Sequence, residues 1–304
     1  MFTILIAGGT GLVGKHLSQL LHAAGHTVLH LSRKQDLGAK FPAYTWDLPK
    51  KTIEQEAVDR ADFIINLAGT GVADQRWTPE RKRLIIGSRV DSTLLLKAAI
   101  ERRPTPLRAF ISASAIGFYG SRGDQLLHED DPMGKDSFLA ESVAAWEKAV
   151  EKIAETGLRT VVLRIGVVLS TRGGALEKML IPFRFFNAAY FGNGQQWMSW
   201  VHIDDICRMF IEAIENEQLS GIYNGVAPHP FRNRDLVVEL KKALGKPAVL
   251  LPAPEFALRA VMGEMADVVF DSTRVSSKKI EAVGFNFNFP GLLPALKDLI
   301  RRKI

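Results

Sequence analysis

The chain opens Met1-Phe-Thr-Ile-Leu-Ile-Ala-Gly-Gly-Thr-Gly-Leu-Val-Gly14, and this stretch decides its fold. Residues 2–7 form a short apolar, partly β-branched run, which predicts a buried parallel strand. Apolar residues then recur at intervals of three and four through residues 15–24, which predicts an amphipathic helix. Gly25 is placed to end that helix in the left-handed conformation, and residues 26–31 predict a second strand. The glycines between strand and helix are Gly8, Gly11 and Gly14.

A glycine pattern that follows a strand and opens a helix, inside a strand–helix–strand unit, is typical of a dinucleotide site. The missing Cβ atoms let the backbone approach a pyrophosphate, and the helix N-terminus offers free N–H groups and the positive end of its dipole. The alternative is a glycine-rich turn with no ligand, which the flanking strands and helix disfavour. The sequence therefore predicts a bound dinucleotide.

The second predicted strand ends at Ser32, Arg33 and Lys34, where a site for NAD usually has an acidic residue that binds the ribose 2′-hydroxyl. A guanidinium binds a 2′-phosphate through two hydrogen bonds, whereas a carboxylate repels it. These residues favour NADP(H), the alternative being two solvated surface cations. Asp47, at the end of the next strand, is placed to reach an adenine amino group or is simply solvated.

Strands and helices alternate through the first part of the chain, which predicts an α/β fold with a Rossmann-type, doubly wound, mostly parallel sheet. The further strands are expected at 44–47, 63–69, 110–115 and 158–169, and the helices at 53–60, 79–100 and 139–155. Thr78 and Pro79 are typical of the start of a helix.

After Ser170 the pattern becomes richer in helices, among them 176–186 and a helix from Arg234 that Asn233 is expected to cap. We expect a dinucleotide-binding domain at 1–170, with strand segments that return from later in the chain. A smaller, helix-rich region at 171–304 would cover the carboxyl edge of the sheet and form the substrate side of the cleft.

The composition narrows the possible functions. The chain has 304 residues, 47% of them hydrophobic and 24% charged, with a formal net charge of +6 and no separate polybasic tail, so we expect no nucleic-acid partner. Polar residues such as Arg164 interrupt the apolar runs, which excludes a membrane span. The single Cys207 excludes an internal disulfide and suits the cytoplasm, and no signal peptide precedes the first strand. We expect a small-molecule partner; the oligomeric state stays open.

Several motifs together resemble the extended short-chain dehydrogenase/reductases, the group of nucleotide-sugar epimerases. They are residues 8–14, Asn66-Leu67-Ala68-Gly69, Ser112-Ala113-Ser114-Ala115 with Tyr119-Gly120, and Val201-His202-Ile203-Asp204-Asp205. A narrower set resembles the atypical "epimerase family protein" branch, whose C-terminal segment of unknown function would begin here at about residue 247. That set includes Arg76-Trp77, Gly87-Ser88-Arg89, Phe138-Leu139-Ala140, Ser199-Trp200 and Gly263-Glu264-Met265-Ala266.

The resemblance implies NADP(H) bound at the strand ends, in an oxidoreductase or epimerase that acts on a small polar or sugar-nucleotide-like substrate. It also implies the cofactor contacts by position. They are Gly8, Thr10, Gly11, Leu12, Val13, Gly14, Ser32, Arg33, Leu67, Ala68, Gly69, Arg89 and the strand end from Gly166 to Val168.

The catalytic pattern of that family matches less well. Its enzymes use a Ser or Thr together with a Tyr and a Lys spaced Y-x-x-x-K, and the Lys cation lowers the pKa of the Tyr. Ser114 matches the serine, but residues 138–143 read Phe-Leu-Ala-Glu-Ser-Val, with neither Tyr nor Lys. The nearest other phenol is Tyr119, so the catalytic candidates are Ser114 and Tyr119.

Each candidate has a plainer alternative. Tyr119 is also explained as an aromatic side chain packed under the cleft, and Ser114 as a hydroxyl that binds only cofactor or backbone. Without a nearby cation, a Tyr titrates near its ordinary pKa of about 10, and Arg89 is the basic residue that the resemblance places near the cofactor. The missing Tyr–Lys pair supports a second function, a catalytically silent NADP(H)-binding redox sensor or regulatory protein.

Two groups of charged residues are expected to be structural. His202, Asp204 and Asp205 suggest a metal site, but capping and packing at a helix start explain them better, so we expect no metal. Glu141 and Glu147 are expected to be acids of a helix surface or of helix packing.

Overall fold

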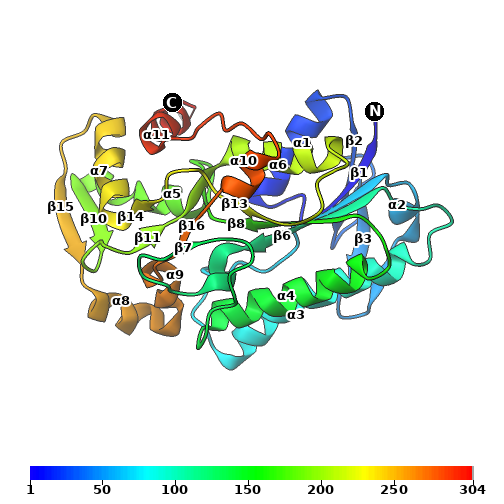
Figure 1. Ribbon diagram of the computed structural model, residues 1–304, viewed down its shortest axis with the longest axis horizontal. Coiled ribbons are helices and arrows are strands. Elements are labelled where there is room, and N and C mark those ends of the chain that lie inside the picture. Colours follow the sequence, from blue (N-terminus) through cyan, green and yellow to red (C-terminus); the bar gives the residue numbers. More distant parts are fainter. Residues whose placement is uncertain (303–304) are drawn as a thin grey trace.

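The computed structural model describes residues 1–302 and is built on an eight-stranded sheet in the order β13-β8-β6-β5-β1-β2-β3-β4 (Figure 1). All neighbouring strands are parallel except the β3–β4 pair, which confirms the expected α/β, doubly wound, mostly parallel sheet. The strands are β1 (Thr3–Ala7), β2 (Thr27–Ser32), β3 (Ala43–Asp47), β4 (Thr52–Ile53), β5 (Phe63–Asn66), β6 (Ala109–Ala115), β8 (Thr160–Ile165) and β13 (Gly221–Gly225).

Helices cover both faces of this sheet. On one face α3 (Pro79–Ile100) and α4 (Phe138–Ala154) run side by side, and on the other α1 (Leu12–Ala23) packs against α6 (Ile203–Glu215) (Figure 1). The short α2 (Gln55–Asp59) lies near the far edge of the sheet. Because both faces are covered, the central strands are buried throughout and read as continuous apolar runs.

The residues predicted to start α3 and to end α1 have these roles in the structure. Thr78 Oγ1 accepts a hydrogen bond from the Arg81 N–H, and Pro79 takes the first helical position of α3. Gly25 follows α1 with φ of +86°, the left-handed conformation that glycine tolerates best.

Two expectations for the later chain are wrong. The helix expected over 176–186 ends early as α5 (Gly174–Met179), followed by the 3₁₀ turn η2 (Pro182–Phe185), because Pro182 has no N–H to continue the helix. Asn233 does not cap α7 (Asn233–Leu244) but lies inside it. Its side-chain oxygen accepts the Phe191 N–H and so joins α7 to β10 (Asn187–Phe191).

The rest of the chain forms a smaller region of short elements beside the carboxyl edge of the sheet (Figure 1). Its paired strands are β9 (Val167–Leu169) with β12 (Trp200–His202), β11 (Trp197–Met198) with β14 (Phe231–Arg232), β10 with β15 (Val249–Ala253), and β16 (Arg274–Val275) with β7 (Leu126–Leu127). Its helices are α8 (Glu255–Met262), α9 (Asp267–Phe270), α10 (Lys278–Ala282) and α11 (Leu292–Arg301), with 3₁₀ turns η1 (Ile116–Tyr119) and η3 (Gly263–Ala266).

The chain crosses between the two regions more than once. β13 and α6 lie beyond residue 170 yet join the large sheet and its helical layer. In residues 1–302 no helix combines the length and apolar character that crossing a bilayer requires.

Candidate dinucleotide and active site

A cavity of about 690 Å³ lies at the carboxyl ends of β1, β2, β3 and β5, which are neighbours in the sheet. Because parallel strands end at the same edge, the loops that follow them converge on this cavity. Six of the predicted cofactor residues line it together: Gly8, Thr10, Ser32, Arg33, Ala68 and Gly69. Trp46, Asp47, Thr70, Asp74 and Ser88 are also in its lining.

The three glycines of the motif differ in how an added side chain would fit. A Cβ on Gly8, whose φ is +85°, would lie 2.7 Å from the Leu67 carbonyl carbon, and one on Gly14 would lie 2.3 Å from the Gly8 oxygen. These two glycines therefore allow close backbone packing. Gly11 differs, because its φ of −74° suits any residue and the one contact within 4 Å of an added Cβ is the Gly8 oxygen, at 3.3 Å.

The start of α1 is suited to an anion. Gly11 gives the helix no side-chain cap, and its first turn contains no acidic residue. The open space at Gly11 thus faces N–H groups that lack a helical partner, together with the positive end of the helix dipole. The residues present fit a pyrophosphate at this point.

The charge at the end of β2 is positive. Among residues 1–302 the Arg33 side chain is exposed and makes no hydrogen bond or ion pair. The two carboxylates in the cavity lining already have cationic neighbours, since Asp47 lies 3.5 Å from Lys50 Nζ and Asp74 lies 3.8 Å from Arg81 Nη2. Arg33 is therefore the cation free to meet a phosphate here, while the adenine contact of Asp47 stays a prediction.

The other predicted contacts are not in the lining of this cavity. Leu67 packs its backbone against Gly8, and Leu12 lines a second cavity next to the first. Val13 and Gly14 lie within α1, and Val168 is half-buried on β9.

Arg89 lies against Gly69 and supports the loop that borders the cavity. Its Nη1 donates to the carbonyl oxygens of Thr70 and Ile85, at 3.0 Å each, and its guanidinium covers the Trp146 ring. Burial, with a smaller contribution from the charge of Arg81, lowers the pKa of Arg89 to about 10. A direct contact between Arg89 and the cofactor stays a prediction.

A buried polar network lies behind the end of β6. Ser114 Oγ donates to Glu147 Oε1 at 2.5 Å, and Arg164 donates to both oxygens of Glu147 at 2.8 and 2.7 Å. The side chains of Arg164 and Glu147 are 3% and 11% exposed. Burial lowers the pKa of Arg164, but the contacts with Glu147 outweigh it and raise the pKa overall.

Sequence reasoning missed this pair. Glu147 was expected to be a helix-surface or packing acid, yet it is the partner of a buried cation. The available signal was Arg164 itself, because a charged residue in a buried strand needs an opposite charge beside it.

Tyr119 is fully buried among Leu127, Val226 and Val275. Its hydroxyl donates to Asn224 Oδ1 at 2.7 Å and accepts from Arg164 Nη1 at 2.9 Å. Burial raises the pKa of Tyr119 to about 12, with Arg164 acting in the opposite direction. The cation beside the Tyr119 hydroxyl is thus Arg164 and not Arg89, and burial still keeps the pKa of Tyr119 above its ordinary value.

His202 caps α6, as expected. Its Nδ1 accepts the Asp204 N–H at 3.0 Å, and the buried Asp205 accepts the N–H groups of Asn288 and Phe289. Donor atoms of His202, Asp204 and Asp298 lie within 4.8 Å of one another, but Arg302 bridges the two carboxylates. In residues 1–302 these acids are thus already neutralised by a protein cation.

Comparison with known proteins gives the family. The model of the "NAD dependent epimerase/dehydratase family" matches residues 4–224. The chain belongs to the NAD-dependent epimerase/dehydratase family. A second model, "Domain of unknown function (DUF1731)", matches residues 253–299, which agrees with the segment expected from about residue 247.

Three members of the epimerase/dehydratase family show how far the likeness extends. The "Epimerase family protein SDR39U1 homolog, chloroplastic" of Arabidopsis thaliana is 36% identical over 98% of this chain and 87% of its own length. The "Epimerase family protein YfhF" of Bacillus subtilis is 34% identical over 98% of this chain and 97% of its own. The crystal structure of human epimerase family protein SDR39U1 (isoform 2) with NADPH has a TM-score of 0.89 at 32% identity, over 98% of this chain and 99% of that one.

Helix α4 is where epimerases of this family with the usual pattern would carry their Tyr and Lys. Here its first turns present Phe138, Leu139, Ser142 and Val143. Ser137 caps the helix by accepting the Ala140 N–H, and Ser142 donates to the Leu139 oxygen. The helix start is well formed, so the pair is absent because of the residue types and not because the helix is displaced.

Proposed function

We propose that this chain binds NADP(H) in the 690 Å³ cavity, with the 2′-phosphate beside Arg33 and the pyrophosphate at the start of α1. One observation carries the proposal: the cavity that the free guanidinium of Arg33 borders is also lined by Gly8 and Thr10, the loop that leads into the uncapped N-terminus of α1. The NADPH in the crystal structure of the human relative supports it.

We further propose that the chain is an oxidoreductase or epimerase that acts on a small polar or sugar-nucleotide-like substrate. When bound, the nicotinamide supplies or accepts a hydride. Ser114 is the proposed catalytic hydroxyl, because it is the second-last residue of β6, near the carboxyl edge of the sheet, where ligands bind in such folds. Glu147 fixes its orientation by accepting its proton in a hydrogen bond.

A second candidate function is a catalytically silent NADP(H)-binding sensor or regulator. The observation that favours it is the state of Tyr119, whose hydroxyl is buried and bonded on both sides. A phenol with a pKa of about 12 stays protonated near neutral pH and is a poor base there. The silent form would bind the dinucleotide in the same cavity.

A substrate screen with NADPH separates the two functions. The natural protein, Ser114→Ala and Tyr119→Phe are assayed against small carbonyl compounds and sugar nucleotides. Loss of about 10²–10⁴-fold in Ser114→Ala supports a catalytic Ser114. Turnover that survives intact in both variants contradicts both assignments, and tight NADPH binding without turnover on any substrate supports the silent function.

A small-molecule partner and a cytoplasmic location also belong to this proposal. Cys207, the single cysteine of the chain, is buried and supplies no disulfide. A single buried cysteine without a disulfide suits a reducing compartment.

A further inference from the structure

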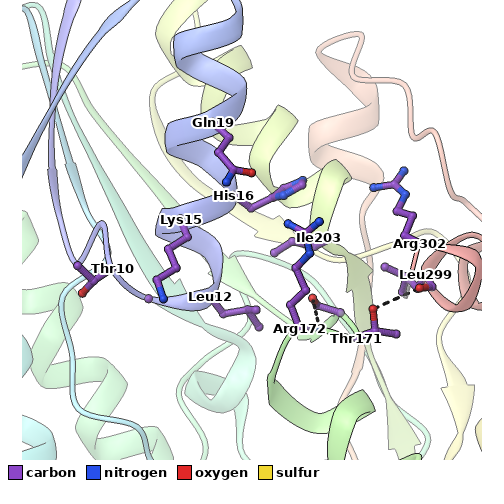
Figure 2. A pocket seen from close by; sticks show the side chains of 12 residues that line it. Thr10, Leu12, Lys15, His16, Gln19, Thr171, Arg172, Ile203, Leu299 and Arg302 are labelled. Atoms are coloured by element: carbon purple, nitrogen blue, oxygen red, sulfur yellow. Dashed lines mark hydrogen bonds between the residues drawn. The ribbon is translucent and has the colours of Figure 1, made fainter. Parts of the chain in front are cut away.

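An exposed apolar patch lies on the smaller region, where β10 and β15 form the end of the molecule opposite β1, β2 and β3 (Figure 1). Its five side chains are Ile181, Phe185, Phe186, Val249 and Leu251. None of them lines the cavity of about 250 Å³ beside the start of α1, which includes the glycine loop and so belongs to the dinucleotide site (Figure 2). A contiguous exposed apolar patch marks a surface that binds a partner.

The pairing of β10 with β15 brings these side chains to one face. Val249 and Leu251 are two residues apart on β15 and therefore point to the same side of the strand. The Val249 N–H donates to the Phe186 oxygen at 2.9 Å, which joins the end of η2 to the start of β15. Leu250 points to the opposite side and packs against the core, so the outward face is the exposed one.

The patch consists of projecting side chains and not of a groove. Phe185 and Phe186 are 71% and 61% exposed, and Val249 is 63% exposed. Phe186 also has a φ of +56°, which is unusual for a bulky residue. A costly backbone conformation that holds an aromatic ring in solvent indicates a role for that ring outside the core. Projecting apolar side chains suit a soft apolar phase such as the interface of a lipid bilayer.

The charged residues beside the patch are all basic. The two segments that form it, residues 178–191 and 245–253, contain Lys178, Arg184 and Lys246 and no acidic residue. The nearest acidic residue before them in the chain is Glu177, on α5. The three basic side chains are exposed, and within residues 1–302 none of them makes an ion pair. This surface therefore complements a negatively charged one.

A second copy of the chain fits this surface poorly. In a two-fold dimer the patch would meet itself, so Lys178, Arg184 and Lys246 would approach the same residues of the other copy, and like charges repel. Addition of a strand to β15 is also disfavoured. The Val249 N–H points to β10, so positions 250 and 252 face the free edge, and Pro252 has no N–H to donate there.

We propose that this patch binds the surface of a lipid bilayer that contains anionic lipids, with Phe185 and Phe186 inserted at the interface and Lys178, Arg184 and Lys246 beside the headgroups. Such binding needs no segment that crosses the bilayer. It goes beyond the proposed function, because the patch lies away from the dinucleotide cavity and binds a different partner. Anionic lipids are enriched in the cytoplasmic leaflet, which agrees with the proposed location.

Co-sedimentation of the full chain with vesicles tests the patch. One set of vesicles is phosphatidylcholine alone, and the other is equal parts of phosphatidylcholine and phosphatidylglycerol. We expect binding to the mixed vesicles that weakens as salt is raised, and binding about tenfold or more weaker to phosphatidylcholine alone.

Two variants separate the apolar contribution from the charge. Phe185→Ser combined with Phe186→Asn should weaken binding to the mixed vesicles about tenfold or more, and asparagine tolerates the left-handed backbone at 186. Arg184→Gln should weaken it about fivefold. The matched control is Leu84→Ser, at an exposed apolar position on α3, which should bind like the natural protein. Circular dichroism confirms that each variant is folded.

Four results overturn the proposal. They are no binding to the mixed vesicles, equal binding to the two kinds of vesicle, binding unchanged in the double phenylalanine variant, and a dimer in sedimentation velocity that this variant converts to a monomer. The last result would make the patch an interface between copies of the chain. If NADPH does not bind, the proposed function fails, while the vesicle measurements still decide this proposal.

Discussion

At the residue scale, Arg33 carries the choice between NADP(H) and NAD(H). We expect Arg33→Asp to remove the preference for NADPH, because losing a charge-assisted hydrogen bond costs about 1.5–3 kcal/mol and the new carboxylate repels the 2′-phosphate. Calorimetric titration of NADPH and NADH into the natural protein and the variant measures this preference. Lys40→Asp, outside the cavity lining, is the control and should keep the preference. Equal affinity of the natural protein for the two dinucleotides contradicts the assignment.

Asp271 gives a prediction about stability and pH. It borders a cavity of about 560 Å³ near Arg259 and Phe270, and burial together with the neighbouring Asp267 raises its pKa to about 6. A carboxyl with a raised pKa stabilises the folded state while protonated and loses that contribution as pH rises through the folded pKa.

We therefore expect Asp271→Asn to increase the free energy of unfolding by about 1–2 kcal/mol at neutral pH, with no gain below about pH 4. Urea unfolding at several pH values measures the difference. Asp130→Asn, at an exposed position, should change stability by less than about 0.5 kcal/mol throughout. If Asp271→Asn increases the free energy of unfolding by the same amount in acid, the ionised carboxylate of Asp271 is not the cause of the increase.

At the element scale, the start of α1 combines a free helix terminus with open space at Gly11. We expect Gly11→Val to abolish dinucleotide binding while the fold survives, because the backbone there suits any residue and the isopropyl group fills the space for the pyrophosphate. NADPH fluorescence titration tests binding, and circular dichroism tests the fold. Gly38→Val, in an exposed loop, should bind normally. Normal binding by Gly11→Val means that this loop is not the site.

The contact between α4 and β8 depends on the Glu147–Arg164 ion pair. Glu147→Gln leaves the buried Arg164 without an opposite charge, and breaking a buried pair from one side typically costs about 3–5 kcal/mol. We expect a loss of that order in urea unfolding. The control is Glu151→Gln, one turn further along α4 and exposed, which should be nearly neutral. Similar losses in the two variants would show that the pair contributes no more than a surface charge.

At the scale of the whole molecule, the sequence predicts the sheet well, because its strands and helices carry regular apolar patterns and Gly8, Gly11 and Gly14 mark the first turn. The position of the proposed dinucleotide cavity follows from that sheet, since the ends of parallel strands meet at one edge.

Local sequence patterns do not predict the network around Ser114, because Glu147, Arg164 and Tyr119 come from three separate segments of the chain. The role of Asn233 was missed for a similar reason, because its contact with β10 is tertiary. The break at Pro182 has a local cause, the missing N–H of proline, which the apolar pattern over 176–186 concealed.

A crystal structure of the protein grown with NADPH would show directly where the dinucleotide binds. We predict one dinucleotide along the carboxyl ends of β1, β2 and β5, with the pyrophosphate on the amides of Gly11 and Leu12 and the 2′-phosphate within hydrogen-bond distance of Arg33. A structure that shows no dinucleotide, or one bound with its 2′-phosphate away from Arg33, contradicts it.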